Sequence, residues 1–268
     1  MAIARRIGMR GAQEEAITGV EMDEFTIDEL AERLRHNPIF ARVSPQNKLD
    51  IVDALNKNNE ITAMTGDGVN DAPALKKADI GISMGQRGTT VAKEASDMIL
   101  LDDRFPTIVE AVRQGRVIFD NIQKFIHYLF SCNLSEIMLI FIAILIRVPT
   151  PLIALQILWL NLVTDVFPAL AMAWETPEAG TMTRPPRDPR KPVITNRHKG
   201  RIAFQGAVIT MGPLFAYLIT LNNGFTLLES RTIGFMTLAL VQLFHVFNVR
   251  RKNGLGFDST VFQNVYLW

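Results

Sequence analysis

Four stretches of this chain are long, apolar and almost free of charged side chains, and they constrain its fold more than any other feature. They are residues 125–147, 152–174, 202–221 and 232–249. A helix needs about 20 predominantly apolar residues to cross a bilayer, and each stretch is close to that length. The charged residues crowd instead into the first 125 positions and two later segments. The sequence therefore predicts a soluble N-terminal part followed by four membrane-spanning helices.

Lysines and arginines are concentrated on one side of the predicted spans. The loop 175–201 carries seven of them, and three more follow the fourth span, whereas the opposite turns near 148–151 and 222–231 offer little beyond a flanking arginine each. Because short cytosolic loops carry an excess of Lys and Arg, we expect a multi-pass membrane protein with a cytosolic N-terminal domain. The basic stretch RPPRDPRKP in the first loop is either a solvated linker stiffened by proline or a site for lipid or a partner, and we favour the linker.

The soluble part alternates short apolar runs with amphipathic helices. Thr26 and Glu29 have the spacing of a capping box that opens a helix over IDELAERLR. A second helix is predicted to begin near Pro45, and short strands are predicted in EITAMTGDG, ADIGISMG and SDMILL. This order of elements is typical of an α/β domain with a parallel sheet.

These signals divide the chain into four parts. Residues 1–103 form a cytosolic α/β domain, and residues 104–124 form a stalk helix that enters the first span without a breaker. The four spans occupy 125–249, and 250–268 is a cytosolic loop followed by the start of a further apolar segment. Both ends of the sequence have the character of interior stretches of a longer protein.

Charge and cysteine content exclude some classes of function. The net charge of +1 gives no reason to expect nucleic acid as a partner. The single cysteine, Cys132, cannot form an internal disulfide and lies in an apolar run, where a small packed side chain is expected.

The segment TGDGVNDAPAL, residues 65–75, carries the most informative polar side chains of the soluble part. Its glycine spacing does not fit the GxGxxG turn of dinucleotide-binding proteins, and carboxylates repel phosphate unless a cation lies between them. Asp67 and Asp71 are therefore candidate Mg²⁺ ligands, with Asn70 as a hydrogen-bonding partner. Lys48, on the preceding helix, is suited to offset the charge of a phosphoryl group during transfer. The alternative is a strand-end turn with exposed aspartates.

Two carboxylates interrupt the predicted spans, where each costs about 2.5–3.5 kcal/mol on insertion scales. Glu136 shares a helix face with Asn133, and Asp165 shares one with Asn161 and is preceded by Thr164. The short connection VPTP between the two spans allows these faces to converge. Either asparagine alone would be interpreted as an interhelical hydrogen bond. Together with two acids, the oxygen-rich set favours a hard cation, and Ca²⁺ in particular.

GDGVNDAPAL followed by ADIGISMG resembles the hinge signature of P-type ATPases, whose phosphorylation domain belongs to the haloacid-dehalogenase superfamily. NLSE and NLVTD in the first two spans resemble the fifth and sixth membrane helices of the sarcoplasmic-reticulum-type calcium pumps. The resemblance covers all 268 residues but only the later part of a complete pump. It implies a partial phosphorylation domain of Rossmann-like, haloacid-dehalogenase-like fold, followed by a transmembrane helix bundle of an ATP-driven cation pump.

The resemblance also implies roles for individual residues. Asp67 would bind Mg²⁺, Asn70 and Asp71 would lie near the phosphoaspartate, and Lys48 would be the lysine of the superfamily. The other turn residues, which we assign to cofactor binding, are Thr65, Gly66 and Gly68.

The membrane residues point to calcium more than to sodium or potassium. Asn161 stands where sodium/potassium pumps have an aspartate, which favours Ca²⁺ as the transported partner. Gln242, in the fourth span, stands where the calcium pumps have a glutamate, and it joins the candidate cation ligands. Mg²⁺ and ATP are the expected cofactor and substrate of the complete pump, and membrane lipid surrounds the spans.

The sequence departs from the family in what it lacks. The DKTGT motif that carries the phosphorylated aspartate, the TGES motif of the actuator domain and a nucleotide-binding domain do not occur in it. We therefore expect the N-terminal part of the same pump as a partner, and no ATP hydrolysis by this chain alone.

Two other interpretations stay open at this point. The chain could be a non-catalytic membrane protein that binds cations or associates with a pump, for which a natural start at Met1 would be the distinguishing feature. A membrane-tethered phosphatase of the haloacid-dehalogenase superfamily ranks last, because no nucleophilic DxD or DxT motif precedes Lys48.

Overall fold

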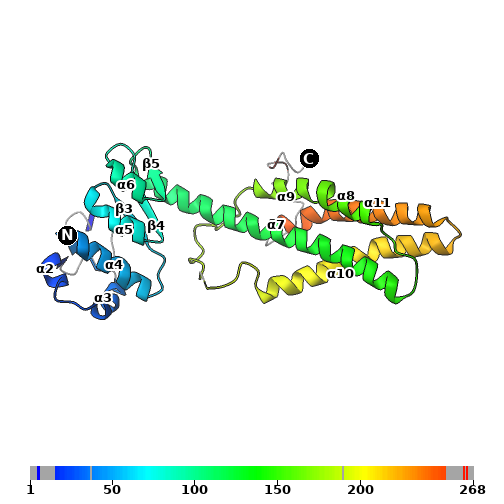
Figure 1. Ribbon diagram of the computed structural model, residues 1–268, viewed down its shortest axis with the longest axis horizontal. Helices are drawn as coiled ribbons and strands as arrows, with labels where there is room; N and C mark the ends of the chain where they lie inside the picture. Colours follow the sequence, from blue (N-terminus) through cyan, green and yellow to red (C-terminus); the bar gives the residue numbers. More distant parts are fainter. Residues whose placement is uncertain are drawn as a thin grey trace. The chain divides into compact units, whose positions relative to one another are not determined.

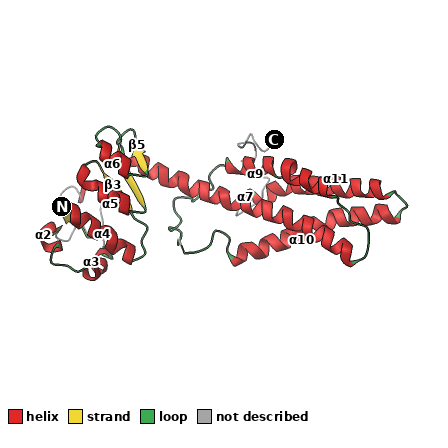
Figure 2. Ribbon diagram, in the orientation of Figure 1, coloured by secondary structure: helices red, strands yellow, loops and turns green. Residues whose placement is uncertain are grey.

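The computed structural model describes residues 5–6, 16–36, 38–188, 190–251, 262 and 264. The chain divides into two compact units, Met1–Glu110 and Ala111–Trp268 (Figure 1). Each unit has its own buried apolar residues. Among the described residues, all strands belong to the first unit and the second is helical (Figure 2).

A parallel three-stranded sheet carries the candidate hinge of the first unit. Its strands β3 (Ala63–Gly66), β4 (Ile80–Met84) and β5 (Met98–Leu100) are hydrogen-bonded in that order. Helix α5 (Ala72–Lys77) leads from β3 to β4, and α6 (Thr90–Ala95) leads from β4 to β5. The predicted alternation of strands and helices in a parallel sheet is confirmed.

Two helices pack together on a small core beside this sheet. Helix α3 (Ile27–Leu34) begins after Thr26, whose side chain accepts the backbone N–H of Glu29, so the predicted capping box is confirmed. Helix α4 (Pro45–Lys57) begins at the predicted proline. Buried apolar residues of both helices form one cluster with Met22. This cluster fixes α4, which carries Lys48.

A second, two-stranded parallel sheet was not predicted. It pairs β1 (Ile17–Thr18) with β2 (Phe40–Ala41), and the short helix α2 (Gly19–Met22) follows β1 directly. Each strand has only two residues, which is too short for alternation of apolar and polar residues to be visible in the sequence.

Four helical segments of the described chain are long and apolar enough to cross a membrane, as predicted. Helix α7 (Phe105–Leu145) contains the expected stalk segment and most of the first span. The third and fourth spans lie in α10 (Asn196–Asn222) and α11 (Leu227–Val249). Gly206 of α10 faces Leu134 of α7, where an added Cβ would come within 3.2 Å of the leucine side chain.

The second span is interrupted. It consists of α8 (Ala154–Trp159), a π-helical turn η2 (Leu160–Thr164) and α9 (Val166–Ala173). In the wide turn the Asp165 N–H donates to the Leu160 carbonyl at 3.0 Å. Pro168 accounts for the interruption, because it has no N–H to donate to the carbonyl of Thr164 and its ring crowds that carbonyl. Turns of this kind occur frequently at functional sites.

Candidate functional site

The hinge segment is organised around the Asp71 carboxylate. Strand β3 ends at Gly66, and Asp71 closes the short 3-10 helix η1 (Val69–Asp71) that precedes α5. One carboxylate oxygen, Oδ2, accepts the backbone N–H groups of Asp67 and Gly68, both at 3.2 Å. The other, Oδ1, accepts a hydrogen bond from Lys48 Nζ, so the two residues also form an ion pair.

The ion pair is largely shielded from water. The Asp71 side chain is 9% exposed and that of Lys48 is 31% exposed. Burial by itself would raise the pKa of Asp71, but the hydrogen bond and charge of Lys48, together with the two backbone N–H groups, outweigh it and hold the pKa below its usual value. Asp71 is therefore an ionised, fully partnered group that shapes the turn.

Gly66 is required by the close approach of the same side chain. A Cβ added at Gly66 would lie 2.5 Å from the Cβ of Asp71, a distance that forces the turn to move. This gives Gly66 a structural role in addition to the cofactor-binding role that we predicted for it.

Asp67 and Asn70 differ from Asp71 because both are exposed at the end of the sheet. The Asp67 side chain has no hydrogen bond or ion pair with a described residue, and its carbonyl accepts the Thr89 N–H at 2.9 Å. An accessible carboxylate with free oxygens fits Mg²⁺, which takes few protein ligands and retains several waters. Of the two aspartates, Asp67 is thus the one free to bind a metal, and Asp71 is occupied by Lys48.

The candidate cation residues of the membrane unit come from three helical segments. Glu136 of α7 accepts hydrogen bonds from Asn161 of η2, at 3.3 Å on Oε2, and from Gln242 of α11, at 3.0 Å on Oε1. Glu136 is 3% exposed and Gln242 is fully buried. These three side chains, predicted from separate spans, therefore meet at one carboxylate.

Asp165 and Thr164 add buried oxygen atoms that receive no N–H or O–H hydrogen bond from a described residue. Asp165 is 1% exposed, and neither of its carboxylate oxygens receives an N–H or O–H hydrogen bond from a described residue. The Thr164 hydroxyl and the Gln242 carbonyl oxygen are buried and unpartnered in the same way. The Cys132 thiol, a weak donor, is a neighbour of the Asp165 carboxylate. A buried carboxylate that no N–H or O–H group satisfies is costly. The site thus presents acceptor oxygens that a cation would satisfy.

Asn133 is not joined to this group by a hydrogen bond. Its amide nitrogen donates to the Leu129 carbonyl of its own helix at 3.0 Å. Within the described residues no group of three or more His, Cys, Asp or Glu side chains is placed to hold a metal. A cation at the cluster would therefore depend on amide, hydroxyl and carbonyl oxygens as well as on two carboxylates.

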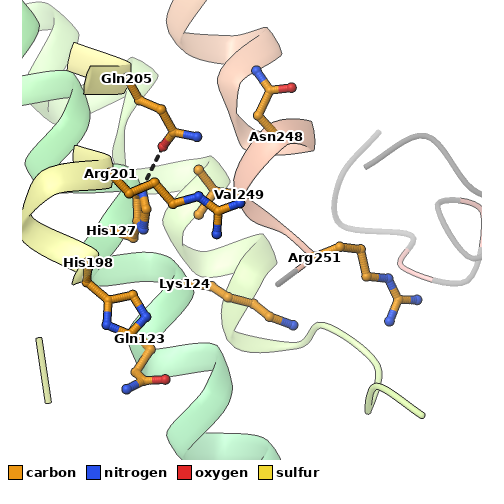
Figure 3. A pocket seen from close by; sticks show the side chains of 9 residues that line it. All are labelled: Gln123, Lys124, His127, His198, Arg201, Gln205, Asn248, Val249 and Arg251. Atoms are coloured by element: carbon orange, nitrogen blue, oxygen red, sulfur yellow. Dashed lines mark hydrogen bonds between the residues drawn. The ribbon is translucent and has the colours of Figure 1, made fainter. Parts of the chain in front are cut away.

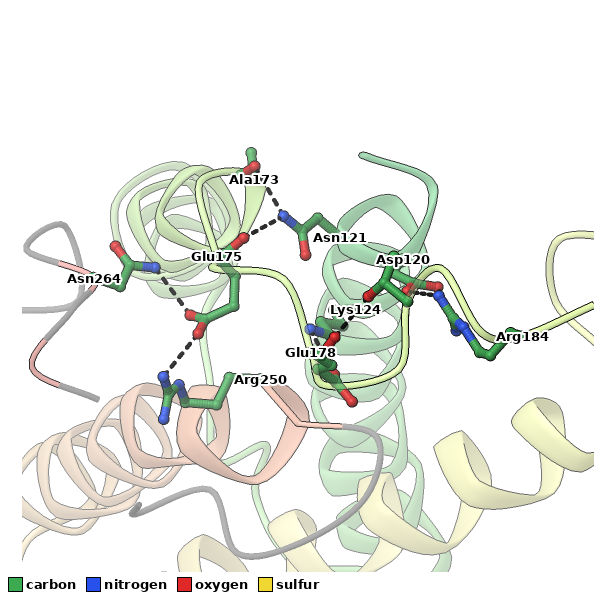
Figure 4. A network of polar contacts seen from close by, with 10 residues as sticks. Asp120, Asn121, Lys124, Ala173, Glu175, Glu178, Arg184, Arg250 and Asn264 are labelled. Carbon is green, nitrogen blue, oxygen red and sulfur yellow. Dashed lines mark hydrogen bonds and ion pairs between the residues drawn. The ribbon is translucent and has the colours of Figure 1, made fainter. Parts of the chain in front are cut away.

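Sequence reasoning missed a buried polar network at one end of the membrane helices (Figure 4). At its centre Glu175, just after α9, accepts hydrogen bonds from Arg250 at 2.7 Å and from Asn264 at 3.0 Å, and its carbonyl accepts one from Asn121 of α7 at 2.9 Å. The Glu175 and Arg250 side chains are both fully buried. Removing one member of such a pair leaves an uncompensated charge, so the network fixes the ends of these helices.

The described residues of the basic stretch are exposed, as expected of a solvated linker, but residues in and before it also contact α7. Arg184 donates to Asp120 of α7 at 2.6 Å, and Arg187 lies over the ring of Phe119 at 4.5 Å. Lys124 pairs with Glu178 of the loop at 2.8 Å. The loop is therefore attached to α7 through specific contacts. The sequence does contain a signal for these contacts, because oppositely charged residues lie just beyond the ends of the first two spans.

Two family descriptions match the chain. Residues 2–79 match haloacid dehalogenase-like hydrolases, and residues 149–268 match the C-terminus of cation-transporting ATPases. The first match covers Lys48 and the hinge, and the second covers Asn161, Asp165 and Gln242.

Curated relatives match almost the whole chain. It is 44% identical over 267 residues to a calcium-transporting ATPase of Bacillus subtilis, and 42% identical over 266 residues to one of Listeria monocytogenes. It is 40% identical over 270 residues to a probable cation-transporting ATPase F of Mycobacterium tuberculosis. Each alignment covers 99% of this chain and 30% of the relative, so the chain spans less than a third of the length of these proteins. With its haloacid-dehalogenase-like sheet and four apolar helices, the chain belongs to the P-type cation-transporting ATPases and corresponds to their C-terminal part.

Proposed function

We propose that this chain forms the cation-binding and part of the phosphorylation machinery of an ATP-driven pump whose cargo is Ca²⁺. The observation that carries the proposal is the Asp165 carboxylate, buried without an N–H or O–H donor next to the span that holds Glu136. The names of relatives from Bacillus subtilis and Listeria monocytogenes, both calcium-transporting ATPases, support the choice of cation.

The donor set suits a hard cation. Ca²⁺ takes about 6–8 oxygen ligands in flexible geometry. Glu136 and Asp165 supply carboxylates, and Thr164 supplies a hydroxyl oxygen. Pro168 leaves the backbone carbonyl of Thr164 without its helical N–H partner, which adds a further oxygen at the same level. The remaining ligands would come from water and from parts of the pump outside this sequence.

The amides of Asn161 and Gln242 have a second role in this proposal. Both now donate N–H groups to Glu136, which holds the carboxylate in place without a cation. A side-chain amide carries one acceptor and two donors. When a cation enters, the amide of Asn161 can present its oxygen instead, whereas that of Gln242 has a buried oxygen already free.

The hinge would serve phosphoryl transfer in the complete pump, with ATP as the substrate. Bound at Asp67, Mg²⁺ would neutralise charge on the transferred phosphoryl group. Lys48 holds Asp71, Asp71 holds the turn through two backbone N–H groups, and the turn presents Asp67 and Asn70 at the end of β3. The aspartate that accepts the phosphoryl group is not in this sequence, which contains no DKTGT motif.

Isothermal titration of Ca²⁺ into the complete pump tests the proposal. Glu136→Gln and Asp165→Asn should each abolish high-affinity binding. Glu229→Gln is the matched control, because Glu229 is an acid of the same helical bundle that caps α11 through Thr226. It should bind Ca²⁺ as the wild type does. Unchanged binding by both cluster variants would remove the basis for a calcium site here.

A further inference from the structure

A basic pocket lies between the middle of α7, the start of α10 and the end of α11, and none of the candidate cation ligands lines it (Figure 3). Its lining includes Lys124 and His127 of α7, His198 and Arg201 of α10, and Arg251 just after α11, and none of the residues that line it is acidic. The excess of Lys and Arg in the adjoining loop places this end of the helices at the cytosolic surface. The pocket therefore lies at the level of lipid headgroups in the inner leaflet.

The cations of the pocket are not equally available. Lys124 is buried and paired with Glu178 at 2.8 Å. Arg201 is exposed and forms no ion pair with a described residue. An unpaired guanidinium presents several N–H donors in a fixed planar fork that matches phosphate oxygens. Arg201 is thus the principal anion-binding group.

A neutral amide beside Arg201 is oriented to assist it. The Gln205 carbonyl oxygen lies 2.6 Å from His127 Nε2, so the histidine ring holds that end of the amide. The Gln205 amide nitrogen keeps its N–H groups free of hydrogen bonds to described residues, and it lies one helical turn from Arg201 on the same face of α10. The two side chains supply donors to one anion.

The helices beside the pocket continue as exposed apolar surface. Phe204 and Val208, three and seven residues after Arg201, are 69% and 56% exposed. Phe244, one turn before Asn248 of the pocket lining, is 61% exposed. A ligand with a phosphate head and apolar tails would match both features, whereas a soluble phosphate would use only the first.

We propose that this pocket binds the phosphate headgroup of an anionic phospholipid from the cytosolic leaflet, with Arg201 and Gln205 as donors and the acyl chains along α10 and α11. Basic pockets between membrane helices on the cytosolic side are suited to such headgroups. The proposal does not depend on which cation the protein transports.

The test measures binding of short-chain phosphatidylglycerol to the complete chain in detergent, by native mass spectrometry across a lipid titration. We expect a saturable adduct of one lipid, and about fivefold weaker apparent affinity for Arg201→Gln, the loss expected for one surface cation. Arg201→Lys keeps the charge but not the planar fork, so it should lose less affinity than Arg201→Gln without matching the wild type. Lys199→Gln is the matched control, since Lys199 is an exposed cation of α10 that does not line the pocket.

Two further arms separate the possible ligands. Inorganic phosphate at the same concentration should not displace the lipid, and short-chain phosphatidylcholine should bind more weakly because its headgroup has no net charge. Equal loss of affinity in Arg201→Gln and Lys199→Gln would overturn the pocket assignment. Displacement by inorganic phosphate would overturn the assignment to lipid.

Discussion

The hinge and the membrane cluster each contain a buried carboxylate, and the two carboxylates differ in the hydrogen-bond donors around them. At the hinge, Asp71 has an ammonium partner and two backbone N–H donors. In the membrane cluster, Asp165 has no N–H or O–H donor among the described residues. Because an unpaired charge is far more costly in an apolar setting than in a polar one, the difference teaches that the hinge is complete as folded and the cluster is not. The proposed function assigns a cation as the additional partner.

The comparison extends to the neighbouring acids. At the hinge the free carboxylate, Asp67, is exposed to water, where Mg²⁺ with its hydration shell can reach it. In the cluster Glu136 is buried and held by two amides. In the proposed function, the exposed site would exchange a hydrated ion and the buried site would hold a dehydrated one.

The largest effect is expected from closing the space that Asp71 occupies. Gly66→Ala places a Cβ 2.5 Å from that of Asp71, so we expect the hinge to lose about 3 kcal/mol of local stability. Hydrogen exchange of peptides that cover β3 and α5 measures this loss. Gly115→Ala is the control, since nothing lies within 4 Å of its added Cβ, and it should leave hinge exchange unchanged.

Removing the ion-pair partner of Asp71 should leave the hinge, like the membrane cluster, with a buried carboxylate that lacks a cationic partner. Lys48→Met leaves the carboxylate with backbone donors only, and we expect a loss of about 2 kcal/mol of local stability, less than for a fully buried pair. Lys77→Met removes the exposed partner of Asp53 and should cost less than about 0.5 kcal/mol. Equal effects of the two variants in hydrogen exchange would contradict the special role of the Lys48 pair.

The stability of the hinge should decrease as the pH is lowered. The pKa of Asp71 is lower in the folded chain than in the unfolded one, so its carboxylate contributes stability above the unfolded value, near pH 4, and this contribution disappears as the pH falls through the folded value. Asp71→Asn should remove that dependence. Hydrogen exchange of the β3 peptides, measured between pH 3 and pH 6 and corrected for the intrinsic rate, checks the direction.

Replacing the carboxylate by an amide should lower stability at the hinge but raise it in the membrane cluster. Asp165→Asn replaces a buried carboxylate that has no N–H or O–H donor with a neutral amide, so the cation-free chain should gain about 1 kcal/mol, or roughly 2–4 °C in its thermal midpoint. Asp71→Asn, measured in the same way, should lower the midpoint. A loss of stability in Asp165→Asn without cation would show that Asp165 already has a satisfying partner.

The smallest effect is expected from Thr164→Val. The Thr164 hydroxyl is buried without a partner, so its loss should change the stability of the cation-free protein by no more than about 0.5 kcal/mol. Ca²⁺ affinity should still fall severalfold because an oxygen ligand is lost. Titration calorimetry beside a thermal scan separates the two effects.

Sequence patterns predicted the elements but not all of their contacts. Apolar runs and turn residues were sufficient for the parallel sheet and the four spans, and helical spacing placed Glu136 and Asp165 on converging faces. The contact of Gln242 with Glu136 joins positions 106 residues apart, and no local rule specifies such a pair. No local rule specifies the ion pair of Glu175 with Arg250 either, because these residues are also far apart in the sequence.

The interruption of the second span has a signal in the sequence. Pro168, four residues after Thr164, indicates an interrupted helix, because proline removes the N–H that the carbonyl needs. The orientation of Asn133 toward its own backbone could not be predicted, since an amide on a helix face can satisfy either its own carbonyls or a neighbouring helix.

Anomalous diffraction from crystals of the complete pump, grown with and without Ca²⁺, tests the central claim most directly. We predict a Ca²⁺-dependent peak about 2.3–2.6 Å from oxygens of Asp165 and Glu136. A Ca²⁺ peak elsewhere in the membrane, with the Asp165 carboxylate hydrogen-bonded within the protein, would contradict the account.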